Sequence, residues 1–424
     1  MTGTHSFGPR FAMHLLAATA CAMVGSAHAQ SEPPPPVAPQ SGPAQPFSFG
    51  ISQTLTHDSN LFRASDHEEE DWTSVTALNF ALDQPIGRQR LHGNAALQMN
   101  RYSEHDELNN MGHELGLQLD WETIGNISGA LGVQSSQHQY RIGLDSATTS
   151  GDGVGKNLES VQSAFLQGRL GGMGLWALQA GVNGLERHYS DDNFADRNDL
   201  SQWGASGGIS YRPTPDLTAT LLGKYDRIDR VDGSENLVAD DVGRKAIELG
   251  VVWQLSGASR IDARVSRAHE NHSVADKRDF WAGGIGWDWQ PSAKLTFRTQ
   301  LLRDTEGASG NVATAEPTMP AAPSGDQLRT AFIWTGRWAA TSKISMTAVA
   351  QWSHRKLGLF AIDVAEPEDR TTAFSLGIRY SPMRALDVGC DISTERRETN
   401  TRDFLVTRPY DATTAGCNLQ FWFR

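Results

Sequence analysis

In the stretch HELGLQLDWE, residues 113–122, apolar side chains alternate with polar residues or glycine from Glu114 onward. In an extended chain, successive side chains point to opposite sides, so the odd-numbered residues from Leu115 to Trp121 share one face. The even-numbered residues from Glu114 to Asp120 share the other face, which is too polar for the packed core of a soluble protein. This pattern is typical of a strand that has lipid on one side and water on the other.

Similar period-2 segments recur along the chain from Phe47 onward. They predict eighteen strands, at 47–56, 72–82, 91–102, 113–122, 127–140, 159–170, 175–189, 200–212, 217–230, 244–255, 260–271, 279–290, 295–305, 328–338, 344–356, 370–381, 386–398 and 412–423. No stretch within this region is apolar for long enough to form a membrane-spanning helix, which needs roughly 20 residues.

The connections between these strands alternate between short and long. Tight turns of Gly, Pro, Ser and Asp stand at 171–174 and 213–216, whereas 57–71, 141–158 and 306–327 are long and polar. Outer-membrane barrels have short periplasmic turns, long extracellular loops and an even number of strands. The sequence therefore predicts an all-β fold, a transmembrane antiparallel up-and-down β-barrel of the outer-membrane type with about 18 strands, over residues 47–424. An even count places both ends of the barrel on the periplasmic side.

Aromatic residues and prolines recur near the ends of the predicted strands. Three strands end on an aromatic residue followed shortly by Pro213, Pro291 or Pro382, and a proline interrupts the hydrogen-bonded ladder. Two girdles of interfacial aromatic residues are also expected, because such rings prefer the level of the lipid headgroups. We assign Trp121, Trp253 and Trp338 to the turn side and Tyr102, Tyr140, Tyr189, Tyr225 and Trp352 to the loop side.

The first 46 residues differ in composition from the rest. Arg10, an apolar stretch of about 14 residues and the triplet Ala27-His28-Ala29 predict a secretory signal peptide over residues 1–29. Cys21 lacks the leucine that a lipoprotein cleavage site carries three residues before its cysteine, so we expect no lipidation. Residues 30–46 contain four consecutive prolines and predict an extended periplasmic linker. The chain is therefore expected in the outer membrane of a Gram-negative bacterium, in contact with its lipid and lipopolysaccharide.

No catalytic constellation emerges from the sequence. The segment 151–157 resembles a phosphate-binding loop, but Ser150 and Asn157 replace the first glycine and the hydroxyl residue of that motif. The thirteen histidines have no metal-ligand spacing, and the formal net charge of -12 argues against nucleic acid as a partner. The acidic run 66–71 has two interpretations, either a solvated loop or a site for divalent cations that bridge lipopolysaccharide. We expect no enzyme, no cofactor and no metal site.

Charged residues on the polar faces of the predicted strands are candidates for lining a lumen. They are Arg264, Arg298, Arg329, Arg337, Arg379, Glu248, Asp262, Asp387 and Asp391. They could attract an anionic sugar polymer, or they could pair with one another across neighbouring strands. Cys390 and Cys417 fall on the last two strands, both on the apolar face, where either a disulfide or two reduced cysteines would fit.

The segment 57–63, HDSNLFR, follows the first predicted strand. It resembles the opening of the β-barrel porin families found with exopolysaccharide gene clusters, including the EpsL type, at Asp58, Asn60, Leu61, Phe62 and Arg63. The resemblance implies a channel that exports an extracellular polysaccharide, supplied by periplasmic and inner-membrane export components. The alternatives are a general diffusion porin, for which 306–327 is the candidate constriction loop, and a non-conducting structural or adhesive barrel.

Overall fold

The computed structural model describes residues 46–140, 156–171, 174–230, 241–273, 277–305, 327–357, 368–400 and 407–423. The expected signal peptide and the linker before Pro46 lie outside these residues, as do the phosphate-loop-like segment up to 155 and the 306–326 loop. Within the described ranges, no helix has the length and apolar character needed to cross a membrane.

Eighteen strands follow one another along the chain, as the sequence predicts. They are β1 (Phe47–Asp58), β2 (Asp71–Ile86), β3 (Gln89–Tyr102), β4 (Asn110–Glu122), β5 (Ile127–Gln139), β6 (Leu158–Leu170), β7 (Trp176–Tyr189), β8 (Leu200–Thr214), β9 (Leu217–Arg230), β10 (Val242–Ser256), β11 (Ser259–His272), β12 (Arg278–Ser292), β13 (Leu295–Thr305), β14 (Gln327–Trp338), β15 (Ile344–Leu357), β16 (Glu368–Met383), β17 (Leu386–Thr399) and β18 (Tyr410–Phe423).

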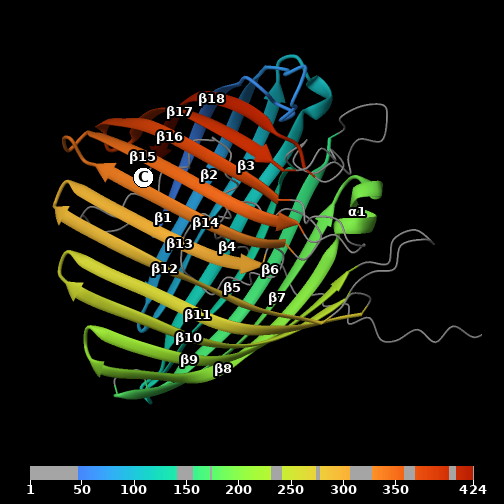
Figure 1. Ribbon diagram of the computed structural model, residues 1–424. Helices are drawn as coiled ribbons and strands as arrows, with labels where there is room; N and C mark the ends of the chain where they lie inside the picture. Colours follow the sequence, from blue (N-terminus) through green and yellow to red (C-terminus); the bar gives the residue numbers. More distant parts are fainter. Residues whose placement is uncertain are drawn as a thin grey trace, which may run out of the picture.

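The strands form one closed antiparallel barrel (Figure 1). Each strand pairs with its neighbours in sequence, and β1 pairs with β18 from Phe49 opposite Phe423 to Asp58 opposite Thr414. Closure leaves no unpaired strand edge, so the backbone polar groups of the wall are satisfied within the sheet. The expected all-β, up-and-down barrel is confirmed.

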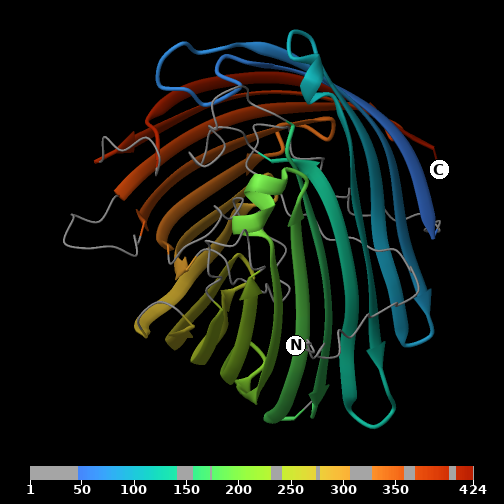
Figure 2. The ribbon, with the colours of Figure 1, turned by 90° about the vertical axis from the view of Figure 1, so that its right-hand side faces the viewer.

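Short turns and long connections lie at opposite ends of the barrel, hereafter the turn end and the loop end (Figures 1 and 2). The loop end also carries a 3-10 helix, Asp106–Leu108, and a short helix, α1 (Asp192–Asn198). Asp191 caps α1 by accepting a hydrogen bond from the Phe194 amide at 2.9 Å. Phe194 is buried against the rings of Tyr140 and Tyr189, which fixes α1 on the end of β7.

The three proline motifs form bulges near the turn end. The register shifts between Tyr211 and Thr214, between Trp289 and Ser292, and between Tyr380 and Met383, so each proline lies inside a shift. The strands continue for two residues beyond the ends that the sequence predicts. A proline has no amide hydrogen for the ladder, and a bulge accommodates that loss without ending the strand.

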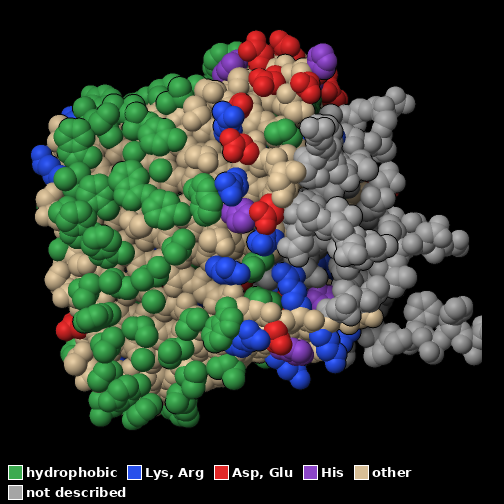
Figure 3. Space-filling model, viewed as in Figure 1, with side chains coloured by type: hydrophobic (Ala, Val, Ile, Leu, Met, Phe, Trp, Pro, Cys, Tyr) green, Lys and Arg blue, Asp and Glu red, His purple; other side chains and the backbone are tan. Residues whose placement is uncertain are grey.

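The outward surface is a broad apolar band (Figure 3). On β16, for example, Phe374, Leu376, Ile378 and Tyr380 are all exposed. On the turn side, Trp253 and Trp338 point outward as expected. A soluble protein does not expose apolar surface on this scale, whereas a lipid-facing wall does.

The loop-side girdle differs from the prediction. Tyr225 and Trp352 face outward, but Tyr140 and Tyr189 are buried and Tyr102 lies on the inward face of β3, opposite Thr73. The prediction for these three tyrosines was wrong because the alternation within a strand, and not proximity to a loop, decides which way a ring points. Three further tryptophans belong to this girdle, because they point outward near the loop end, where β2, β8 and β12 begin: Trp72, Trp203 and Trp281.

Candidate functional site: the barrel lumen

The inward face of the wall is polar and reaches solvent. Pairing registers place every second residue of each strand inward, including Arg264 on β11 and Asp304 on β13. Although both point into the barrel, their side chains are 42% and 37% exposed. A filled interior would cover such groups. Water therefore reaches these inward positions, and a barrel of this strand number is wide enough to hold a lumen.

The part of the lumen wall that β9 to β13 form carries several ion pairs. Lys224 Nζ lies 2.8 Å from Glu248 Oε2, and Arg264 Nη2 lies 3.3 Å from Asp304 Oδ2. Arg298 lies 2.7 Å from Asp288. The two signs are balanced along this wall, which we call the charged wall. Lys224, Asp288 and Asp304 were not among the predicted lumen residues, although the alternation within their strands indicates their inward position.

A glycine on β12 allows two strands of the charged wall to interact across a third. Arg298 on β13 also reaches Asp262 on β11, with Nη2 and Oδ1 3.7 Å apart. A Cβ atom at Gly286, which lies between them, would come within 2.8 Å of the Asp262 carboxylate oxygens. The missing side chain therefore leaves room for the Asp262–Arg298 contact.

The opposite side of the lumen is mainly neutral at mid-height. Its inward residues on β2 to β7 include Asn79, Asn94, Gln98, Gln134, Gln179 and Asn183, which we call the amide wall; the carboxylate of Glu114 lies among them, opposite Ala96 and Ser136. Asn79 donates to Ser52 Oγ at 3.1 Å, and Ser163 donates to Gln134 Oε1 at 3.2 Å. In a closed ring of eighteen strands, β3 lies opposite β12, so the amide wall faces the charged wall across the lumen.

All nine charged residues singled out from the sequence lie on inward-facing positions of their strands, and four of them, Glu248, Asp262, Arg264 and Arg298, belong to the charged wall. The other five are spread over β14 to β17. Arg329 and Arg337 lie at opposite ends of β14, and Arg379 lies opposite Gly389. Asp387 accepts a hydrogen bond from the Ser381 hydroxyl, and Asp391 lies opposite Gly377.

The five signature residues form a clasp at the loop end of the β1–β18 seam. Arg63 Nη1 donates to Asp58 Oδ1 at 2.8 Å and also to the Asn60 carbonyl. The fully buried Asn60 side chain donates to the carbonyl oxygens of Ala64, at 2.8 Å, and Asp411, at 2.9 Å. Arg63 also lies 3.7 Å from Glu395 of β17. This seam clasp thus ties the loop after β1 to the last two strands.

Leu61 and Phe62 hold the outer part of the same loop. The Leu61 amide donates to the Glu69 carbonyl at 2.8 Å, and the Phe62 ring packs edge-on against His105 at 4.8 Å between centroids. The signature residues therefore stabilise the rim, and none of them lies at mid-height along the channel wall.

The acidic run 66–71 splits between solvent and structure. Asp71 is buried and accepts the backbone amides of Ser103, Glu104 and His105 at 3.0, 3.1 and 3.2 Å. The imidazole of His105 lies 3.0 Å from Asp71 and 2.9 Å from Glu69. No group of three or more His, Cys, Asp or Glu side chains in the described ranges is arranged to hold a metal ion.

His105 makes the 103–109 loop sensitive to pH. Burial alone would lower the pKa of His105, but hydrogen bonds to Glu69 and Asp71 outweigh it and raise the pKa. A raised pKa in the folded state means that the stabilisation is complete below the ordinary value of about 6.5 and is lost as the pH rises through the raised value. We expect the Ser103, Glu104 and His105 amides to exchange hydrogen faster, after correction for the intrinsic rate, as the pH rises from about 6 to about 9. His105→Gln should remove this pH dependence while β3 amides stay unchanged, and a pH dependence that persists in the variant would contradict the assignment.

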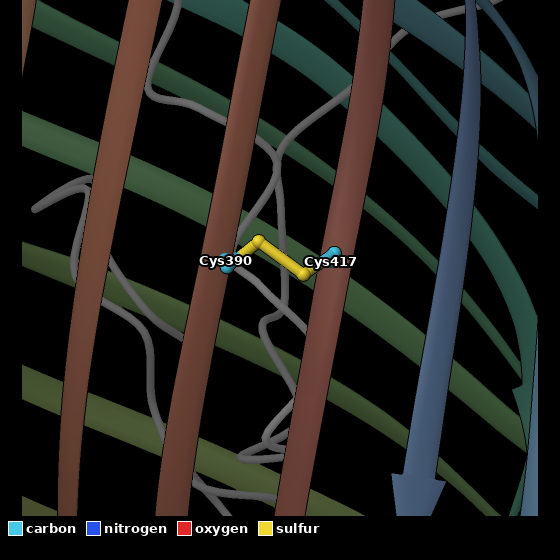
Figure 4. Close-up of a disulfide and its surroundings, with 2 residues drawn as sticks. All are labelled: Cys390 and Cys417. Carbon is cyan, nitrogen blue, oxygen red and sulfur yellow. A yellow bond between two sulfur atoms is a disulfide. The ribbon is translucent and has the colours of Figure 1, made fainter.

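Cys390 and Cys417 are joined by a disulfide on the lipid-facing side of β17 and β18 (Figure 4). The two residues are directly opposite in the register, with their Cα atoms 4.1 Å apart. The bond closes a loop with a sequence separation of 27 residues. In the chain-entropy model such a loop stabilises the folded state by about 3.5 kcal/mol. The bond thus links the strand that closes the barrel to its neighbour.

A closed antiparallel barrel with an apolar outer band, aromatic residues at its borders and a wet polar interior is an outer-membrane β-barrel. No protein-family model matches the chain, and no curated protein does. Solved structures that it resembles include OpdQ of Pseudomonas aeruginosa, at 12% identity and a TM-score of 0.48, covering 90% of this chain and 99% of that one. OccAB2 of Acinetobacter baumannii matches at 10% identity and a TM-score of 0.49, over 89% and 98% of the two chains. OpdH of Pseudomonas aeruginosa matches at 12% identity and 0.47, with the same coverage as OccAB2.

Proposed function

We propose that this barrel is a water-filled diffusion channel for small polar solutes. The observation that carries the proposal is the solvent exposure of the inward charges, including Arg264, Asp304 and Asp288. A non-conducting structural barrel would instead fill its interior with its own side chains. The geometry therefore favours a passage over a purely structural role.

The charged wall suggests weak ion selectivity. Its cations, including Lys224, Arg264 and Arg298, each lie close to a carboxylate. A permeating ion thus meets alternating signs and no long run of one charge. We expect small anions and cations to pass with similar ease.

Single-channel conductance of the refolded protein in a planar bilayer tests the proposal. We expect stepwise currents whose size grows with salt concentration and changes little when neutral oligosaccharides are added to one side. No conductance from correctly folded protein would overturn the proposal and favour a structural or adhesive barrel. Heat-modifiable migration on a gel verifies folding independently of conductance.

A sugar chain is the second candidate for the cargo, and the amide wall is the observation that favours it. Asn and Gln side chains both donate and accept hydrogen bonds, which suits hydroxyl-rich solutes. Export of an exopolysaccharide would also match the resemblance of the 57–63 segment, and it would need periplasmic and inner-membrane components to supply the polymer. Currents blocked by anionic oligosaccharides, with Asn94→Ala and Gln98→Ala weakening the block, would favour this candidate over general diffusion.

A further inference from the structure

Outward-facing cations gather on neighbouring strands near the loop end of the barrel. Arg227 on β9, Lys245 on β10, Arg267 on β11 and Arg303 on β13 all have exposed side chains on the outward face. We call these four residues the basic belt. A cation on the outward wall of a membrane barrel is costly at the level of the acyl chains, so the belt marks the level at which headgroups begin.

The belt lies directly at the border of the apolar band. On β10, β11 and β13, the outward residue two positions nearer the turn end is aliphatic and exposed: Ile247, Val265 and Leu301. Trp203 lies opposite Arg227 in the register, and the Arg267 guanidinium lies 5.5 Å from the centre of the Trp281 ring. Figure 3 shows Lys and Arg side chains along this loop-side border of the apolar surface. The belt therefore has aliphatic side chains on its turn-end side and aromatic rings at its own level, and both are features of a lipid interface.

Two of the four cations are not neutralised. Arg227 Nε lies 2.6 Å from Asp229, and Arg267 Nη2 lies 3.6 Å from Asp279. Lys245 and Arg303 have no ion pair with any residue that the structure describes. Charges without partners on a lipid-facing surface call for an anion from the lipid itself.

The basic belt is one part of a larger set of outward cations, since Lys356 on β15, Arg370 on β16 and Arg396 on β17 are also exposed near the loop end. At a comparable distance from the loop end, the outward positions of β1, β3 and β4 carry Leu55, Met99 and Met111. Arg101 is a single outward cation on that side, one outward position above Met99. The outward Lys and Arg side chains of the described strands therefore lie mainly on one part of the barrel's circumference.

We propose that the basic belt binds the phosphate groups of a phosphorylated glycolipid, lipopolysaccharide, in the outer leaflet. The belt is on the extracellular side of the barrel, where the long loops lie. Neighbouring strands are about 4.8 Å apart, so the belt spans about 19 Å from β9 to β13. This width suits a headgroup with more than one phosphate better than a phospholipid with a single one. Arginine and lysine are the side chains that bind phosphate oxygens most strongly.

The test is binding of diphosphorylated lipid A to the full-length protein in phosphatidylcholine nanodiscs, measured by native mass spectrometry. We expect Lys245→Gln with Arg303→Gln to weaken binding by about 30-fold, as for two cations at a lipid surface. Arg101→Gln is the matched control, since it removes an outward arginine away from the belt, and it should leave binding unchanged.

Equal binding by the wild type and the double variant would overturn the proposal, and so would an equal loss in Arg101→Gln. Phosphatidylglycerol that binds as tightly as lipid A would overturn the assignment to a glycolipid. The conductance of both variants should equal that of the wild type, because the belt lies outside the lumen. A failure of this proposal is thus distinguishable from a failure of the proposed channel function.

Discussion

Arg63→Ala is expected to lower the free energy of unfolding by about 3–5 kcal/mol, because it leaves the buried Asp58 and Glu395 carboxylates without their shared cation. Both carboxylates and the guanidinium are largely buried, so water does not replace the lost contacts. Arg63 has a positive φ of 51°, so the substituted alanine keeps an unfavourable backbone conformation without the bonds that hold it there.

Equilibrium unfolding in urea from lipid vesicles measures this change. Arg101→Ala is the control, since Arg101 is an exposed arginine on β3, and it should shift the free energy of unfolding by less than about 0.5 kcal/mol. Asn60→Ala should destabilise in the same direction, because the Asn60 side chain bonds to both Ala64 and Asp411. An Arg63→Ala barrel as stable as the control would show that the seam does not depend on the clasp.

The wall of this barrel was predictable because lipid and water impose a strict alternation on it. Each expected strand overlaps an observed one, and the nine charged residues taken from the polar faces point inward. The same rule, applied within the strand, would have corrected the loop-side girdle. On β7, Trp176, Leu178 and Val182 are outward, so Tyr189 with its odd number must be inward.

Contacts between distant parts of the chain were not predictable in this way. The bond from Asn60 to the Asp411 carbonyl joins residues 351 positions apart, and no local pattern specifies that distance. The resemblance to exopolysaccharide-associated porins singled out the 57–63 segment and associated it with transport of a polysaccharide. In the structure, the side chains of this segment stabilise the loop end of the barrel. The ion pairs of the charged wall likewise needed the pairing register, since Lys224 and Glu248 are each ordinary inward charges when viewed alone.

Ion pairs differ between the rim and the charged wall of the barrel. At the loop end, Arg244 pairs with Glu270 and Arg187 with Glu159, and all four side chains are largely buried. On the charged wall, by contrast, the members of the Arg264–Asp304 pair are open to solvent. Removing one partner of a buried pair is strongly destabilising, whereas exposed pairs contribute little. The buried charges at the rim therefore stabilise the loop end, whereas the paired but exposed charges of the charged wall are accessible to solutes.

Asp369→Ala should cost about 3–5 kcal/mol at the same rim, because this carboxylate is the shared anion of a buried network. It accepts Arg355 Nε and Nη2 at 2.9 and 2.5 Å and the Thr407 hydroxyl at 2.9 Å. Asp369→Asn should cost nearly as much, since it keeps the shape but removes the charge.

Adding Arg355→Met to Asp369→Ala should recover at least about 1.5 kcal/mol, because the second change removes the guanidinium that the first deprives of the Asp369 carboxylate. Unfolding of the two single variants and the double variant, compared in one thermodynamic cycle, gives this coupling energy directly. Costs that simply add would mean that Asp369 and Arg355 act independently. The loop end would then be stabilised by Thr407 and the strand ladder and not by the charge pair. If the pair does stabilise the β15–β16 rim, the loss of unfolding free energy caused by Asp369→Ala must become smaller when Arg355 is replaced as well.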